Sequence, residues 1–228
     1  MLKDLEKRLP NLKRVLLSST YRHFESRPNH KEFCKYSGHL YYYNVNAFNR
    51  PTYFKDELLF LSNPDFYSQL LKKYYVDKEK YTYNRWGFQT DTLKSRFKSF
   101  NYDKESLESS YKNNYPEVKK EYLAETSDWL HKVLEICARR NIEVIITLTP
   151  VYSDYYANQI KKGVITRRDS ILRRVLIKYP STRIFDEERN TDFTVYDFLN
   201  ENHLNPRGAE KFTKKLNFFI NDSLEVKK

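Results

Sequence analysis

The sequence predicts an α/β fold in which a parallel sheet is covered by helices on both faces. Short runs of β-branched and aliphatic residues alternate with longer segments whose apolar residues recur at helical spacing. Sheets formed by such an alternation are parallel. The chain has 228 residues, of which 39% are hydrophobic and 31% are charged. It is therefore long enough to bury the core of one substantial domain.

The N-terminal end predicts one helix and one strand. Residues 2–9 form a charged amphipathic pattern that Pro10 ends. Residues 14–19 form a compact aliphatic run that ends in hydroxyl residues, which is typical of a strand. This end lacks the apolar core of a signal peptide, and no apolar run in the chain is long enough to span a bilayer. We expect a cytoplasmic protein as the chain is written, and a cell-envelope or periplasmic protein if the true N-terminus is longer.

The C-terminal half alternates helices and strands. Helical spacing marks residues 118–137, 161–178 and 205–220, and β-branched runs mark residues 142–148 and 182–185. The run over 142–148 is apolar throughout, so it predicts a central strand buried on both faces. Asn205 is the expected N-cap of the last helix, with Pro206 in its first turn.

Residues 20–115 do not follow this alternation. They hold 14 of the 20 tyrosines and predict only short helices, such as residues 65–75. We expect a single α/β domain over residues 1–228, with residues 20–115 as an aromatic-rich insertion that packs on it as a cap or lid. The aromatic side chains form a small core of the insertion or, alternatively, a stacking surface for sugar rings or bases.

Positive charge dominates the chain, with a formal net charge of +11. It is most concentrated over residues 161–178, where an apolar stripe predicts that the charges lie on the opposite, solvated face. The alternative is contact with an anionic polymer, either a polysaccharide, a membrane surface or, less favoured, a nucleic acid. The residues proposed for that contact are Arg167, Arg168, Arg173 and Arg174. Cys34 and Cys137 lack metal-ligand spacing, and we expect neither a metal nor a cofactor.

His203 is the candidate catalytic residue. It follows a short acidic and amide-rich loop and stands just before a helix start. Imidazole takes up a proton near neutral pH, so a histidine in such a loop suits general-base chemistry. Ligand sites of open parallel sheets lie beyond the C-terminal ends of the strands. Ser18, Ser19 and residues 149–153 also fall at such ends, and we expect them to meet His203 in one site.

Three blocks carry a resemblance to a known family. The first is His203-Leu204-Asn205 followed by Gly208-Ala209 and Phe212. The second is the strand over 142–148 with Thr149-Pro150, Tyr152 and Tyr155, and the third is an interior strand within residues 9–21. The blocks resemble the SGNH (GDSL-like) hydrolase superfamily. The branch most similar to them includes the alginate O-acetylation proteins and the D-alanyl transfer protein of teichoic acid modification.

The resemblance implies a three-layer α/β/α fold with a parallel sheet (SGNH or flavodoxin-like), incomplete at its N-terminus. It also implies a serine nucleophile, His203 as the base, and a carboxylate three residues before the histidine. Asn200 stands at that position, so Asp197 or Glu201 would have to supply the carboxylate. The family's Gly-x-Ser nucleophile block is lacking, because none of the four glycines stands two positions before a serine.

The expected function is therefore an SGNH-like ester hydrolase or O-acyltransferase that acts on an acylated carbohydrate or a small acyl ester, impaired or truncated in its catalytic set. The mechanism would pass through an acyl-serine, with His203 as base. The residues expected to bind substrate are Ser19, Tyr21, Thr149, Tyr152 and Asn205. The alternative is a non-catalytic module that binds an anionic polysaccharide.

Overall fold

The computed structural model describes residues 9–20, 95–111 and 120–225, and shorter pieces at 23–24, 39–41, 44, 46, 50–58, 61, 64–78 and 83–85. Residues 2–8 of the predicted N-terminal helix, the predicted substrate residue Tyr21 and Cys34 lie outside this description. Within it, the chain is a mixed α/β protein with a parallel sheet, as predicted.

Three strands form the main sheet in the order β1-β2-β3. They are β1 (Arg14–Ser18), β2 (Glu143–Leu148) and β3 (Thr182–Asp186). Both outer strands pair with β2 in parallel, and five of its six residues are buried. The prediction of a buried central strand is confirmed. β1, which was expected to be an interior strand, has β2 as its single strand partner in the described part of the chain.

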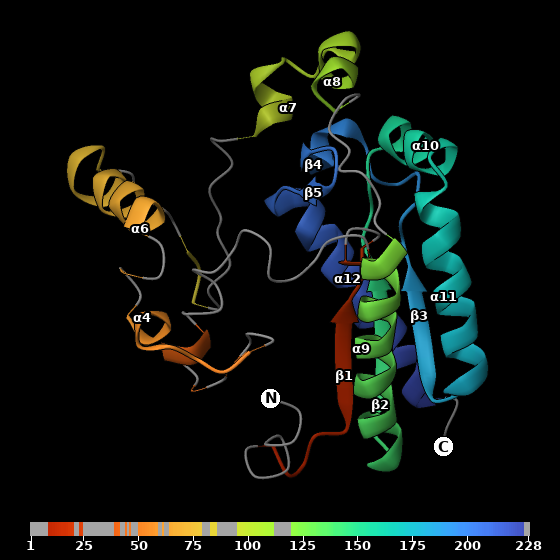
Figure 1. Cartoon of the computed structure of the whole chain (residues 1–228). Helices are drawn as coiled ribbons and strands as arrows, with labels where there is room; N and C mark the ends of the chain where they lie inside the picture. Colours follow the sequence, from red (N-terminus) through yellow and green to blue (C-terminus); the bar gives the residue numbers. More distant parts are fainter. Residues whose placement is uncertain are drawn as a thin grey trace.

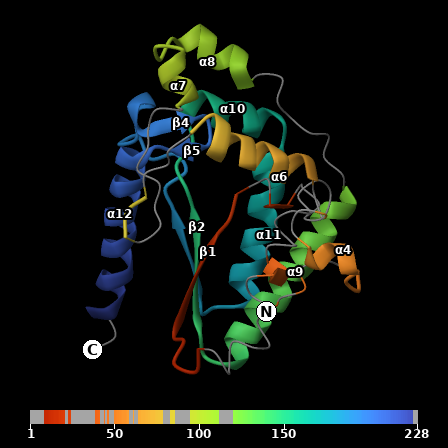
Figure 2. The same cartoon turned by 90° about the vertical axis from the view of Figure 1, so that its left-hand side faces the viewer.

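Helices lie on both faces of this sheet (Figures 1 and 2). On one face are α9 (Lys120–Arg139) and α11 (Val164–Lys178), and on the other is α12 (Pro206–Glu225). The face under α9 and α11 holds the larger apolar cluster, in which Leu134 and Val175 pack with Ile146. All three helices were predicted from their apolar spacing.

The apolar stripe of α12 faces the sheet. The Phe185 ring of β3 lies 5.5 Å from the Phe212 ring and 5.0 Å from the Phe219 ring. Because Phe212 and Phe219 are seven residues apart, both belong to one side of the helix. The predicted inward stripe of the last helix is therefore confirmed.

A second, largely aromatic core lies beyond the C-terminal ends of the strands (Figure 1). It joins α7 (Arg96–Ser99), α8 (Lys104–Tyr111) and α10 (Ser153–Lys161) to an antiparallel hairpin of β4 (Phe198–Asn200) and β5 (His203–Leu204). Its buried members include Phe97, Leu107 and Tyr111, which come from the segment predicted as an insertion. Residues 95–111 thus pack directly on the hairpin that carries His203.

Further helices in the middle of the chain are α4 (Phe54–Glu57) and α6 (Pro64–Leu71), which continues as a π-helical turn (Lys72–Val76). α6 with its π-helical continuation matches the short helix predicted over residues 65–75. No residue of α6 is buried, and Figure 1 shows this helix apart from the main sheet. The prediction that residues 20–115 form a cap or lid stays a prediction.

Candidate functional site

The first turn of α12 holds the hairpin that carries His203. Asn205 Oδ1 accepts a hydrogen bond from the Gly208 N–H at 3.0 Å, and its Nδ2 donates to the Tyr196 carbonyl at 2.6 Å. The predicted N-cap is confirmed. A Cβ on Gly208 would lie 2.2 Å from the Asp197 carbonyl oxygen, so only glycine fits there. Asn205, expected to bind substrate, instead uses both polar atoms of its side chain to fix the helix start.

Asn200 and His203 face each other across the β4–β5 hairpin. Asn200 Oδ1 lies 2.8 Å from His203 Nδ1, and the same oxygen accepts the Asn202 backbone N–H at 3.2 Å. Because a backbone N–H can only donate, the amide atom that faces it must be the oxygen. His203 must therefore carry a proton on Nδ1, which makes Nε2 the unprotonated nitrogen of the neutral ring.

Asp197 does not orient His203, which corrects the expectation that it supplies the missing carboxylate. It is completely buried, and its carboxylate accepts hydrogen bonds from Lys211 Nζ at 2.8 Å and from the Thr194 N–H at 2.9 Å. Arg207 Nε lies 3.1 Å from its second oxygen. Burial acts to raise the pKa of Asp197, but these hydrogen bonds and positive charges outweigh it and hold that pKa below its ordinary value.

Glu201, the other carboxylate considered for this role, forms an ion pair with Arg96 at the start of α7. Its backbone carbonyl accepts the Tyr152 N–H at 3.0 Å. The residue thus ties the hairpin both to α7 and to the loop after β2. Among the described contacts, the neutral amide of Asn200 faces the imidazole, whereas the carboxylates of Asp197 and Glu201 bind other residues.

Thr149 and Tyr152 lie in the loop after β2, as predicted. Thr149 is half-buried directly after the strand. The Tyr152 ring lies 5.3 Å from the Phe97 ring in the aromatic core, and burial raises the pKa of its hydroxyl. The loop is bonded to the His203 hairpin through Tyr152, so these two predicted parts of the site do come together.

A buried ion pair anchors the loop after β3. Arg168 of α11 donates to the Glu188 carboxylate at 2.5 and 2.8 Å, and the two residues are 2% and 4% exposed. Burial raises the pKa of Glu188 against the opposing effect of the guanidinium. For Arg168, both the predicted solvated position and the alternative contact with an anionic polymer are therefore wrong, because its guanidinium is buried and paired.

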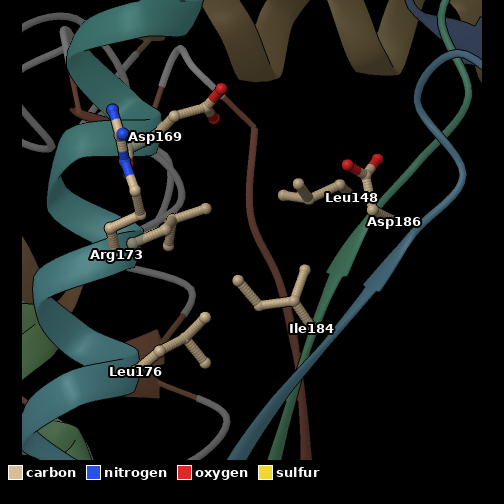
Figure 3. A pocket seen from close by; sticks show the side chains of 7 residues that line it. Leu148, Asp169, Arg173, Leu176, Ile184 and Asp186 are labelled. Carbon is tan, nitrogen blue, oxygen red and sulfur yellow. The ribbon is translucent and has the colours of Figure 1, made fainter.

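The other three arginines proposed for a polymer also differ in exposure. Arg167 is half-buried, whereas Arg173 and Arg174 are exposed. Figure 3 shows Arg173 and Asp169 on α11 facing Asp186 across a cavity of about 410 Å³, which Leu148 and Ile184 also line. Asp169 and Asp186 line the same cavity as Arg173, and their carboxylates reduce the positive potential that a polyanion requires.

Ser18 ends β1 and Ser19 follows it, and both line a separate pocket on the α9 side of the sheet. It measures about 300 Å³, and its other polar members are His23 and Thr126. None of the residues that hold His203 lines it. The single site expected from the strand ends is thus represented by two groups of residues, one around His203 and one at the end of β1.

His23 and Thr126 were not singled out from the sequence. Thr126 lies among the apolar residues of the α9 stripe, where a hydroxyl is inconspicuous, and His23 lies in the part of the sequence that lacks the helix–strand alternation. In the described part of the chain, no group of His, Cys, Asp and Glu residues is arranged to hold a metal ion. Within the same residues, no helix is long and apolar enough to cross a membrane.

Comparison with protein-family models, with curated proteins and with solved structures finds no match to this chain. A function for it therefore rests on the chemistry of its own residues.

Proposed function

We propose that this chain is an SGNH-like ester hydrolase or O-acyltransferase domain that acts on an acylated carbohydrate, with His203 as general base. The sheet with α9 and α11 on one face and α12 on the other would be the three-layer arrangement of that superfamily. The observation that carries the proposal is the contact between Asn200 Oδ1 and His203 Nδ1, at the spacing where the family places its orienting residue.

The base acts on a hydroxyl group. His203 Nε2 accepts the proton of the attacking hydroxyl while the hydroxyl oxygen bonds to the ester carbonyl carbon. The imidazolium ring then returns this proton to the alkoxide that leaves when the C–O bond of the ester breaks. The resemblance implies a serine as the source of that hydroxyl. Asn200 keeps the proton on Nδ1 throughout, so Nε2 is the nitrogen that accepts the proton of the hydroxyl.

The amide at position 200 supports only part of a carboxylate's role. Asn200 fixes the tautomer, but it carries no negative charge to stabilise the imidazolium. In a well-studied triad, replacing the carboxylate by an amide costs about 10⁴ in rate and leaves the wrong tautomer. The Asn202 N–H prevents that error here, because it turns the amide oxygen toward both donors. The base is therefore weakened and correctly oriented.

Hydrolysis of 4-nitrophenyl acetate and acetate release from glucose pentaacetate test the proposal. The full chain should hydrolyse both, and His203→Ala should reduce both rates to those of the uncatalysed reaction. His39→Ala is the matched control, because His39 is an exposed histidine outside the hairpin and should leave both rates unchanged. Equal rates for the wild-type chain and His203→Ala would refute the catalytic role.

A fluorophosphonate probe followed by mass spectrometry identifies the attacking group. Labelling of one serine that disappears in His203→Ala supports the acyl-serine route. Hydrolysis that depends on His203 without a labelled serine would instead mean that the base activates water. The chain would then still be an ester hydrolase, but its mechanism would not pass through an acyl-serine.

A further inference from the structure

The pocket at the end of β1 is open on one side, is lined mainly by apolar side chains and holds several hydrogen-bond donors. Its walls come from β1, from Phe24 and from the helix α9, which contributes Trp129, Leu130 and Val133. Phe24 is 3% exposed and Leu130 is 9% exposed, so these walls belong to the core of the domain. At about 300 Å³, the pocket lies at the lower end of the range for small-molecule sites.

Thr126 brings an unsatisfied hydroxyl to this pocket. Its Oγ1 is buried and has no hydrogen-bond partner. Buried polar atoms in folded proteins are paired in the large majority, and leaving one unpaired is unfavourable. A hydroxyl in this state that also lines a cavity is satisfied when a ligand supplies the partner.

His23 presents a second donor. Its Nδ1 accepts the Thr20 backbone N–H at 3.0 Å, and a backbone N–H can only donate. The neutral ring must then carry its proton on Nε2, which becomes an N–H donor. Ser19, which is 6% exposed, adds a hydroxyl to the same lining.

No Asp, Glu, Lys or Arg is among the described residues that line the pocket. Lys132 lies nearby, with its Nζ 4.8 Å from the centre of the Trp129 ring, but it is paired with Asp128 at 2.7 Å. A charged ligand would therefore lose its hydration without gaining a counter-ion in the pocket.

We propose that this pocket binds a neutral small molecule with an apolar body and a carbonyl oxygen, which accepts hydrogen bonds from Thr126 and His23. The apolar walls take the body of the ligand, and the donors take its oxygen. A carboxamide or ester of an aliphatic acid has this chemistry. The proposal does not depend on any catalytic role of His203.

Octanamide is the probe, and the fluorescence of Trp129 is the readout. The chain has two tryptophans, so the titration uses the Trp86→Phe background, in which Trp129 is the single emitter. Octanamide should change the emission saturably. Octanoate and octylammonium should bind at least about tenfold more weakly, because their charges must be desolvated.

Two variants locate the binding. Val133→Phe fills the pocket and should abolish saturable binding, while thermal unfolding checks that it is folded. Thr126→Val keeps the shape and removes the hydroxyl, so octanamide should bind about fivefold more weakly. Thr213→Val on α12 is the matched control and should leave the affinity unchanged. The proposal is overturned if octanamide shows no saturable binding, if Thr126→Val binds it as tightly as the parent, or if octanoate binds as tightly as octanamide.

Discussion

The regions around His203 and His23 hold the same side chain in opposite tautomers. His203 donates from Nδ1 to Asn200 Oδ1, which makes Nε2 a base, whereas His23 accepts the Thr20 N–H at Nδ1, which makes Nε2 a donor. One backbone N–H decides the tautomer in each region, directly at His23 and through the Asn200 amide at His203. The chemistry that a histidine offers is therefore set by the partner of its other ring nitrogen.

The two regions also differ in what supports them. The His203 hairpin packs on the aromatic core through Phe198, and it is also held by polar contacts of the buried Asp197 and of Glu201. The His23 pocket rests on apolar packing between β1 and α9. Charge-removing substitutions should therefore disturb the first region far more than the second.

Breaking the buried ion pair should have the largest effect. Arg168→Met leaves the Glu188 carboxylate buried without its counter-ion, so the free energy of unfolding should fall by about 3–5 kcal/mol. Urea unfolding measures this. Arg174→Met removes an exposed charge from the same helix and should stay within about 0.5 kcal/mol of the wild type. A loss for Arg168→Met no larger than for Arg174→Met would contradict the anchoring role.

Asp197→Asn should have the next largest effect, with a defined pH dependence. Its pKa is lowered on folding, so its stabilisation is fully present above the ordinary value of 3.8 and is lost as the pH falls through the lower, folded-state pKa. At neutral pH the variant should lose about 1.5–3 kcal/mol of unfolding free energy, the range for hydrogen bonds to a charged group. The difference in unfolding free energy between the wild type and Asp197→Asn should become smaller below pH 3.8.

Urea unfolding at neutral and acid pH checks this prediction. Asp192→Asn is the control, because Asp192 is paired with Lys215 on the surface and such pairs contribute at most about 1 kcal/mol. If Asp197→Asn lowers the unfolding free energy equally at both pH values, its effect comes from altered packing of the side chain and not from the lost negative charge.

A carboxylate at position 200 tests whether this residue positions and supports His203 as a base. Asn200→Asp keeps an acceptor for the Asn202 N–H and adds the charge that stabilises the imidazolium. Hydrolysis of 4-nitrophenyl acetate should accelerate by about tenfold, less than the 10⁴ ascribed to a full amide replacement because the tautomer is already correct. Asn200→Leu should slow it. An unchanged rate in both variants would mean that Asn200 does not position the base.

The smallest expected effect lies in the His23 region and has the opposite sign. Thr126→Val removes a buried hydroxyl without a partner and keeps the side-chain shape, so the ligand-free protein should gain about 1 kcal/mol. Thr213→Val on α12 removes a hydroxyl that donates to the Ala209 carbonyl and is the paired control. Thermal unfolding measures both, and a loss of stability in Thr126→Val would show that its hydroxyl is satisfied.

The backbone framework could be predicted from the sequence because its signals are local. The apolar run of β2, the stripes of α9 and α12 and the Asn205 cap each depend on neighbours within a few positions. The burial of Arg168 could not be predicted in this way. It depends on Glu188, which lies 20 residues further along the chain, and helical spacing alone places the arginine among solvated charges.

The candidate site shows the same division. The contact between Asn200 and His203 follows from a separation of three residues in a hairpin. Asp197 and Asn205 belong to the same motif, yet their side chains bind residues of α12. The imidazole of His203 is contacted by Asn200. Thr126 and His23 line one pocket because α9 packs on the same side of the sheet as the end of β1, a long-range arrangement with no signature in either segment.

The tautomers of the two histidines test the central claim most directly. Long-range ¹H–¹⁵N spectra at about pH 8.5, where imidazole rings are neutral, distinguish protonated from unprotonated ring nitrogens. His203→Gln and His23→Gln assign the two spin systems among the five histidines. We predict a proton on Nδ1 of His203 and on Nε2 of His23. A proton on Nε2 of His203 would contradict its assignment as an oriented base.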